Sequence, residues 1–346
     1  MIERRAFIQL VLTHLRGYIR EPEAIFWTYG FPLIMVIGLG LAFNNDAETQ
    51  TAFTVAQQSA SHPLVNKLKH DAKFKVDVLP MEQALDAVRR NRTPLVVSVG
   101  AGGGFEYYFD PTNPEGRTAR SVVDDALQRA GGRADVFPSA EHKTDAPGSR
   151  YVDFLVPGLI GMNLMGAGLW GIGFSLVDMR VKNLLKRLIA TPMRRSQFLL
   201  SLICSRIVFF IPELLFLLIA AHLIFGVPIA GSYLSILAIA FLGSLTFAGI
   251  GLLTASRARR IESISGLMNL VMVPMWLGSG IFFSAERFPD LLQPVIQSLP
   301  LTQLINALRA IILAGAPLAS QTTAFLVLGT WCVASYLAAL KLFRWG

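Results

Sequence analysis

The chain has 346 residues, of which 53% are hydrophobic and 16% charged, and its mean hydropathy is +0.51. This composition is too apolar and too poor in charge for an ordinary soluble domain of this length, so it favours an integral membrane protein. A net charge of +8 would fit nucleic-acid binding only if the basic residues gathered on one folded face. They fall instead in short segments between apolar runs, and we expect no nucleic-acid partner.

The first segment of the chain, residues 2–20, carries apolar and basic residues at helical spacing, largely on opposite faces. This pattern is typical of a helix that lies in the membrane interface. We therefore expect residues 1–22 to form an interfacial amphipathic helix on the cytoplasmic side. A cleaved signal peptide is the competing interpretation, but the apolar run that follows starts too late and is too long for one.

Six apolar runs follow that are long enough to cross about 30 Å of hydrocarbon, which takes about 20 helical residues. They cover roughly residues 24–43, 152–177, 198–225, 232–255, 263–283 and 321–343. Lys and Arg concentrate before the first run and after the second, fourth and sixth. Because basic residues accumulate in short cytoplasmic loops, both termini are expected in the cytoplasm and residues 44–150 outside. The first crossing is then 23–43, and residues 151–346 hold the other five.

The long segment between the first two runs, residues 44–150, has the pattern of a small α+β domain. The expected elements are strands at residues 74–78, 95–99 and 105–109 and helices at residues 81–90 and 119–130. Residues 131–150 carry glycines, two prolines and scattered charges, which indicates a linker back to the membrane.

No motif supports enzymatic chemistry. The loop Gly100–Gly104 follows a strand, but a phosphate-binding loop needs a Lys and a Ser or Thr that open a helix, and here a strand follows. No Gly-Lys dipeptide occurs, so the chain has no Walker loop. The five histidines lack the spacing of metal ligands, and Cys204 and Cys332 lie in apolar runs. We expect no catalytic, cofactor-binding or metal-binding residue in this chain, and no enzymatic activity.

Two charged residues, Arg206 and Glu213, lie inside the third apolar run. Seven residues make close to two helical turns, so the two side chains share a face. Charges in lipid are costly and usually face a bundle interior or a water-filled cavity. They can partner each other through an intervening group, pair with other helices, or line a substrate path.

Two further segments are unusual. Residues 288–313 are apolar but are interrupted by Pro289, Pro294 and Pro300, which predicts a pair of half-helices that dip into the membrane from the outer face and return. Residues 181–189 form a short, basic, amphipathic piece that Thr191-Pro192 ends. This piece can rest on anionic lipid headgroups or dock into a soluble partner.

The order and spacing of several short motifs carry a resemblance over nearly the whole chain. They are Lys186-Arg187-Leu188 with Thr191-Pro192, Phe225-Gly226-Val227-Pro228 with Gly231-Ser232, Gly249-Ile250-Gly251-Leu252-Leu253, Ser279-Gly280-Ile281-Phe282-Phe283, Pro300-Leu301-Thr302 running on to Arg309, and Tyr108 to Pro114 in the external segment. In these motifs the chain resembles the type-2 family of ATP-binding-cassette exporter permeases, in the branch with a large external domain between the first two crossings.

The resemblance implies roles for particular residues. Residues 2–20 correspond to the family's connecting helix and residues 181–192 to its coupling helix, which rests on the ATPase subunit. The implied coupling residues are Leu184, Leu185, Lys186, Arg187, Leu188, Thr191 and Pro192. Residues 288–313 correspond to re-entrant half-helices that close the outer gate, and the implied gate residues are Pro289, Pro294, Pro300, Thr302 and Arg309. The coupling segment departs from the family in being unusually basic where members often have an acidic residue near its start. Asp178 is the candidate for that acidic position.

The expected function is therefore the membrane permease subunit of an ATP-driven exporter in the bacterial inner membrane. ATP and Mg²⁺ would bind to a partner ATPase subunit, and the other partners would be the lipid bilayer, a second permease copy or paralogue and, as an option, a membrane-fusion protein. An amphipathic drug or lipid would suit a cavity lined by Met162, Met165, Met268, Met272, Met275 and Trp276, although core packing explains the same residues. The alternatives are a membrane-anchored sensor and an intramembrane lipid-modifying enzyme.

Overall fold

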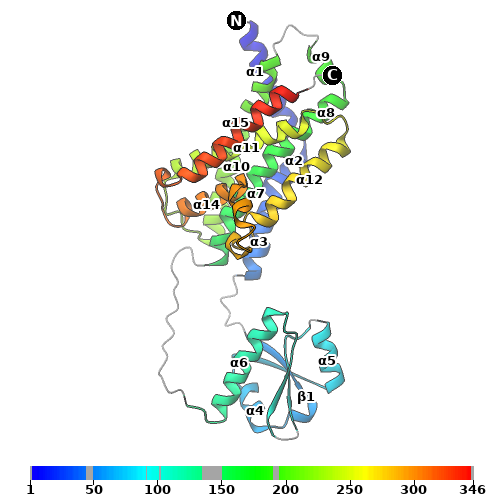
Figure 1. Ribbon diagram of the computed structural model, residues 1–346, viewed down its shortest axis with the longest axis vertical. Helices are drawn as coiled ribbons and strands as arrows, with labels where there is room; N and C mark the ends of the chain where they lie inside the picture. Colours follow the sequence, from blue (N-terminus) through cyan, green and yellow to red (C-terminus); the bar gives the residue numbers. More distant parts are fainter. Residues whose placement is uncertain are drawn as a thin grey trace. The chain divides into compact units, whose positions relative to one another are not determined.

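The computed structural model describes residues 2–43, 50–90, 92–100, 103–134, 150–189 and 195–343. Contacts divide the chain into two compact units (Figure 1). Residues 1–44 and 144–346 form one unit, called the helical unit below, and residues 45–143 form the other, called the α/β unit.

The helical unit contains helices of very different lengths. The elements in chain order are α1 (Ile2–Ile19), α2 (Pro22–Ile25), the π-helical η1 (Phe26–Gly30), α3 (Phe31–Phe43), α7 (Tyr151–Gly168), the π-helical η3 (Leu169–Phe174), α8 (Ser175–Val181), α9 (Leu184–Ile189), α10 (Arg195–Phe225), α11 (Tyr233–Ala255), α12 (Ile261–Gly278), η4 (Ala285–Arg287), α13 (Gln293–Ser298), α14 (Pro300–Ile312), η5 (Leu318–Ser320) and α15 (Thr322–Leu342).

Five helices in the described residues are long and apolar enough to cross a membrane. They are Tyr151–Val181, Leu200–Phe225, Tyr233–Ala255, Ile261–Gly278 and Thr322–Leu342. The first of these runs through α7, η3 and α8 without a break. The chain is thus a mainly helical, multi-pass membrane protein with a small sheet, as its sequence predicts. The remaining expected run, residues 24–43, contains the shorter apolar helix Phe26–Gly40.

Helix α11 is the centre of the helical unit, because it packs against α7, η3, α14 and α15 (Figure 1). Small residues allow the close approach. A Cβ added at Gly251 would lie 2.8 Å from the carbonyl oxygen of Gly168. Without a strong hydrophobic drive between helices in lipid, this kind of contact supplies much of the packing energy.

The outward faces of α10, α12 and α15 are apolar instead of polar. Leu223, Leu270 and Leu326 are 76%, 70% and 71% exposed. Apolar surface on this scale is costly in water but not in hydrocarbon, so these faces suit lipid or another membrane-embedded surface.

The predicted runs end differently where glycine and proline intervene. The run 263–283 stops being helical at Gly278, and Gly280 has a φ of +79°, a conformation that suits glycine and ends a helix. In the segment 288–313, Pro294 and Pro300 lie in the first turns of α13 and α14. Proline is tolerated there because the first N–H groups of a helix have no partner within it.

The α/β unit is built on a four-stranded sheet with the order β2-β1-β3-β4. Its elements are β1 (Thr51–Ala56), η2 (Gln57–Ser59), α4 (Pro63–Lys69), β2 (Phe74–Leu79), α5 (Met81–Arg89), β3 (Val96–Val99), β4 (Phe105–Tyr108) and α6 (Pro114–Ala130). β1 is parallel to β2 and β3, and β4 is antiparallel to β3. Strand β1 and helix α4 were not among the expected elements.

Helices cover both faces of this sheet (Figure 1). α4 and α6 lie on one face, where Phe53, Val55 and Val97 pack against Leu68 and Val123 in one buried cluster. α5 lies on the other face, where it contacts β1 and β3. Its Ala84 is fully buried.

The contact between Gly251 and Gly168 yields a stability prediction. We expect Gly251→Ala to lower the melting temperature in detergent, because the added methyl group overlaps backbone atoms and overpacking of this kind costs about 1–3 kcal/mol. Gly266→Ala on α12 is the matched control, since an added Cβ there meets nothing within 4 Å. Equal melting temperatures for the two variants would contradict the packing described for α11.

Candidate functional site

The segment after the first long span is where the sequence places a coupling helix. The structure divides it into α8 and α9, with a turn at Lys182-Asn183. Asn183 has a φ of 55°, and asparagine is among the few residues that adopt this left-handed conformation readily. The helix expected near residues 181–192 thus begins at Leu184, because Asn183 ends α8 and directs the chain into a new helix. Its coupling role stays a prediction.

The described residues of α9 divide into one that faces inward and three that face outward. Leu185 is 2% exposed and belongs to the main apolar cluster of the helical unit. Leu184 is 38% exposed, and Lys186 and Arg187 are exposed as well. Leu185 thus anchors α9, and the other three side chains are accessible. Of the remaining coupling residues, nothing is described for the Leu188 side chain, and Thr191 and Pro192 lie outside the described residues.

The turn before α9 carries an exposed ion pair. The Lys182 ammonium lies 2.7 Å from Asp178 Oδ2. The hydrogen bond and the charge of Asp178 raise the pKa of Lys182, so the Lys182 charge persists at any physiological pH.

Arg180 joins the end of α8 to the end of α11. Its guanidinium donates to the carbonyl oxygen of Ala255 at 2.9 Å and also to the carbonyls of Ser256 and Ala258. Phe343, just past α15, places its ring 5.5 Å from the same guanidinium. A cation at a helix C-terminus satisfies free carbonyls and complements the helix dipole. Movement of α8 is therefore linked directly to α11 and to the end of α15, which lie at the same end of the helical unit (Figure 1).

The two intramembrane charges form a direct ion pair. Arg206 Nη2 lies 2.5 Å from Glu213 Oε2, and both side chains are buried. Neither an intervening group nor a second charged helix is needed, because the long arginine side chain spans two turns of α10. The role of the pair in a substrate path stays a prediction.

Asn163 on α7 lies close to this pair and was not singled out from the sequence. Its side-chain amide lies within hydrogen-bonding reach of the Glu213 carboxylate. The same amide donates to the carbonyl oxygen of Thr28 at 3.2 Å. A single Asn in a long apolar run is the signal that could have found it. Through Asn163 the ion pair is connected to the π-helical segment η1.

At the opposite end of the helical unit, Arg309 of α14 binds backbone carbonyls. Its guanidinium donates to Phe154 O at 3.1 and 3.2 Å and to Gly280 O at 2.5 Å, and it lies 3.6 Å from the centre of the Phe154 ring. Tyr151 donates from its hydroxyl to Phe282 O at 2.8 Å. These bonds hold the start of α7, the turn after α12 and α14 together.

The other gate residues are distributed over that same segment. Pro300 and Thr302 are buried at the start of α14, whereas Pro289 and Pro294 are exposed. Among these residues, Arg309 has the side-chain hydrogen bonds that connect separate elements, from α14 to Phe154 of α7 and to Gly280 after α12. The role of these residues as an outer gate stays a prediction.

The methionines proposed to line a cavity are packed in the core in this state. Met162, Met165, Met268, Met272 and Met275 are all at most 7% exposed. Trp276 is half-buried, and Trp170 donates from Nε1 to Met272 Sδ at 3.2 Å. A cavity at these side chains would require α7 and α12 to separate, so the substrate-lining role stays a prediction.

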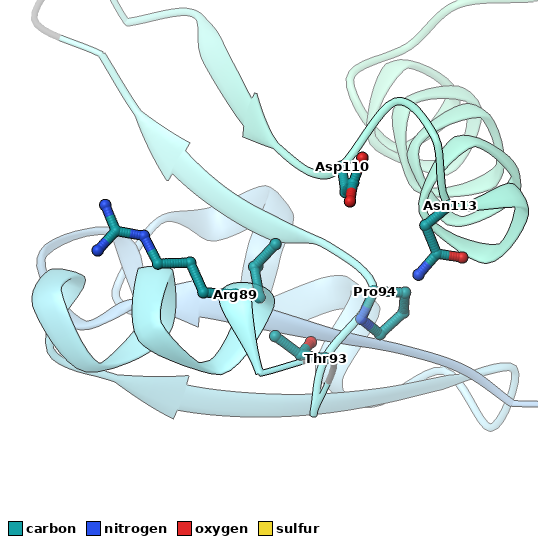
Figure 2. Close-up of a pocket in the computed structure, with 6 residues that line it drawn as sticks. Arg89, Thr93, Pro94, Asp110 and Asn113 are labelled. Atoms are coloured by element: carbon teal, nitrogen blue, oxygen red, sulfur yellow. The ribbon is translucent and has the colours of Figure 1, made fainter.

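The α/β unit has a hollow of its own, shown in Figure 2, with a volume of about 210 Å³. Val88, Arg89, Thr93, Pro94, Asp110 and Asn113 line it. Asn113 caps the first turn of α6, and Thr112 donates two hydrogen bonds to Asp110 Oδ1, which lower the pKa of that carboxyl group. The Arg89 guanidinium extends away from Asp110 (Figure 2). The polar groups of the hollow thus serve local turns and a helix cap.

These features define the class of the protein. Long apolar helices with apolar outer faces make it a multi-pass helical membrane protein, and among the described residues no group of three or more His, Cys, Asp or Glu side chains could hold a metal ion. The sequence profile of the ABC-2 family transporter proteins matches residues 22–341. The chain belongs to this family.

Curated proteins of two kinds are similar to the chain. The ABC transporter G family member 20 of Dictyostelium discoideum is 28% identical over 193 residues, which is 54% of this chain and 26% of that protein. The probable multidrug ABC transporter permease YbhS of Escherichia coli strain K12 is 28% identical over 170 residues, which is 47% of this chain and 43% of that protein. The chain thus spans less than half the length of these relatives.

The buried ion pair yields a second prediction. Glu213→Gln leaves the Arg206 charge buried without its partner, and such a loss costs about 3–5 kcal/mol. We expect a large fall in the detergent melting temperature. The double variant Arg206→Met/Glu213→Leu removes both charges and should recover most of the stability. A double variant that is less stable than Glu213→Gln would contradict the interpretation that Arg206 and Glu213 serve only to neutralise each other.

A third prediction concerns Arg180. Arg180→Ala leaves carbonyls at the end of α11 without donors, and hydrogen bonds to charged groups contribute about 1.5–3 kcal/mol. We expect a lower melting temperature for Arg180→Ala and an intermediate one for Arg180→Lys, because an ammonium cannot fork between several carbonyls. Arg187→Ala, an exposed position in α9, should melt like the parent protein. A parent-like melting temperature for Arg180→Ala would argue against the proposed link between α8 and α11.

Proposed function

We propose that this chain is the transmembrane permease subunit of an ATP-driven exporter, which moves an amphipathic molecule out of the cytoplasm or the inner leaflet of the membrane. Two permeases would work with two ATPase subunits that bind ATP and Mg²⁺. One observation carries the proposal: α9 is anchored through Leu185 while Leu184, Lys186 and Arg187 remain exposed. Such a short helix suits docking into a soluble subunit. The chain's membership of a transporter family supports this role for α9.

The contacts of Arg180 suggest how ATP binding would reach the membrane helices. A displacement of α9 by the ATPase moves α8, and the Arg180 guanidinium connects α8 with the end of α11. α11 contacts α7, η3, α14 and α15, so its movement changes the packing of most of the unit. Coupling requires that ATP-bound and nucleotide-free ATPase stabilise different arrangements of these helices.

The topology of the proposed exporter has six crossings. The segment from η1 through α3 forms the remaining crossing, and α13 and α14 form a re-entrant pair at the outer end. Basic residues near the ends of α8, α11 and α15 favour a cytoplasmic location for both termini and an external location for the α/β unit. The inner membrane of a bacterium is the proposed site.

The proposed substrate is an amphipathic drug-like molecule or lipid. The buried methionines between α7 and α12 support it, because methionine adapts its shape to varied surfaces when helices separate. One relative carries the name probable multidrug ABC transporter permease, which agrees with such a substrate.

The coupling role is tested by Leu184→Asp. We expect this variant to insert and fold normally but to co-purify with its ATPase at least ten-fold less, which corresponds to about 1.4 kcal/mol, and to lose ATP-dependent efflux of an amphipathic dye. Leu185→Asp is unsuitable because that side chain is buried.

Val122→Asp is the control, since Val122 on α6 of the α/β unit is 40% exposed and Leu184 is 38% exposed. It should leave both ATPase binding and efflux unchanged. Normal co-purification and efflux for Leu184→Asp would overturn the assignment of α9. Efflux without any ATPase would overturn the proposed function as a whole.

A further inference from the structure

Strand β2 forms one edge of the sheet in the α/β unit. It pairs with β1 over six residues, from Thr51 opposite Phe74 to Ala56 opposite Leu79. Among the described strands none lies on its other side. An edge strand exposes a row of backbone hydrogen-bonding groups, which can pair with another strand.

The hydrogen bonds to β1 show which groups of β2 face outward. Thr51 N–H donates to the carbonyl of Lys73 at 2.9 Å. Because backbone direction alternates along a strand, Lys75 and Asp77 also direct their groups toward β1. The outward groups then belong to Phe74, Val76 and Val78. The Phe74 N–H is engaged by Asp71 O at 3.1 Å, which leaves the Phe74 carbonyl and both groups of Val76 and Val78 facing outward.

These groups are complementary to a second copy of the same strand. In an antiparallel pair with its two-fold axis at Val76, the two Val76 residues exchange two hydrogen bonds. Each Val78 N–H then meets the Phe74 carbonyl of the other copy, which gives two more. All four bonds use outward groups, and the occupied Phe74 N–H is not required.

The same register places opposite charges face to face. Lys75 lies opposite Asp77 of the second copy, and both side chains are exposed. These are non-hydrogen-bonded positions, where side chains come closest, with Cα atoms about 4.5 Å apart. A two-fold axis at Phe74 would instead oppose Lys73 and Lys75. Opposite charges across an antiparallel pair are stabilising and like charges are not, so the axis at Val76 is the favoured register.

We propose that the α/β units of two copies of this chain associate through β2, edge to edge and antiparallel about Val76, to form one continuous eight-stranded sheet. Four hydrogen bonds and two ion pairs would hold two free domains only weakly. Two units tethered to one pair of permeases experience a high effective concentration, so a weak edge is sufficient. In this respect the inference rests on the proposed pairing of two permeases.

The alternative role of the charges is protection of a solitary edge, which lysines commonly provide. Lys73 and Lys75 would serve that role, and an acidic residue at position 77 would weaken it. Charge reversal separates the two roles. Lys75→Asp and Asp77→Lys each create like-charge pairs across the two copies, whereas the double variant restores opposite charges.

The experiment uses the full-length chain in membranes with both native cysteines replaced by serine. Val76→Cys places two thiols at a hydrogen-bonded antiparallel position, where Cα atoms lie about 5.5 Å apart, within the range that a disulfide bridges. We expect oxidation to give at least ten-fold more cross-linked dimer than Arg117→Cys, an exposed control position on α6. The yield should fall several-fold with either single charge reversal and recover in the double variant.

Cross-linking of Val76→Cys no greater than that of Arg117→Cys, or a double reversal no better than the single ones, would overturn the interface. ATP-dependent efflux is measured in the same vesicles. Efflux without cross-linking rejects the interface and retains the exporter function. Cross-linking that follows the charge pattern supports the interface even where efflux is absent.

Discussion

Hydrocarbon offers no hydrogen-bonding partner to a peptide group, and most of this structure follows from that constraint. Backbone groups in the apolar runs are satisfied within helices. The helices can then pack closely only where side chains are small, as Gly168 and Gly251 show. Where helices end inside the unit, long cations reach the free carbonyls: Arg180 does so at the end of α11 and Arg309 at the turn after α12.

The same constraint explains how charge is distributed in the helical unit. Arg206 and Glu213 neutralise each other within one helix, so their burial requires no charged partner from elsewhere. Arg180 and Arg309 lie near opposite ends of the bundle and bind carbonyls and aromatic rings instead of carboxylates. Arg180 thus connects α8, which leads into the proposed docking helix α9, to α11. Arg309 of α14 connects the start of α7 and the turn after α12 at the other end. Arginine–carbonyl contacts therefore join separate elements at both ends of the helical unit.

The α/β unit has the apolar core and polar surface of a water-soluble domain. Its strands bury Phe53, Val55 and Val97 beneath α4 and α6, and none of its described charged side chains is buried. Pairing at its exposed β2 edge would consequently depend on backbone hydrogen-bonding groups and on two charges, Lys75 and Asp77, and not on buried apolar area. If the edge pairs with its counterpart, the unit supplies a second connection between two permeases in addition to their membrane helices.

The sequence by itself determined the membrane class, five of the long helices, most of the second unit's elements and the shared face of Arg206 and Glu213, because hydropathy and helical spacing are local properties. It missed β1 and α4, since Thr51–Ala56 and the short helix after it have weak periodicity and are defined by pairing with β2 and packing beneath α6. Only the tertiary structure decided that Asn183 breaks the coupling segment, that Leu185 faces inward and that Asn163 lies beside the ion pair. Which face of a short helix is buried depends on neighbours distant in the chain, and local pattern carries no record of them.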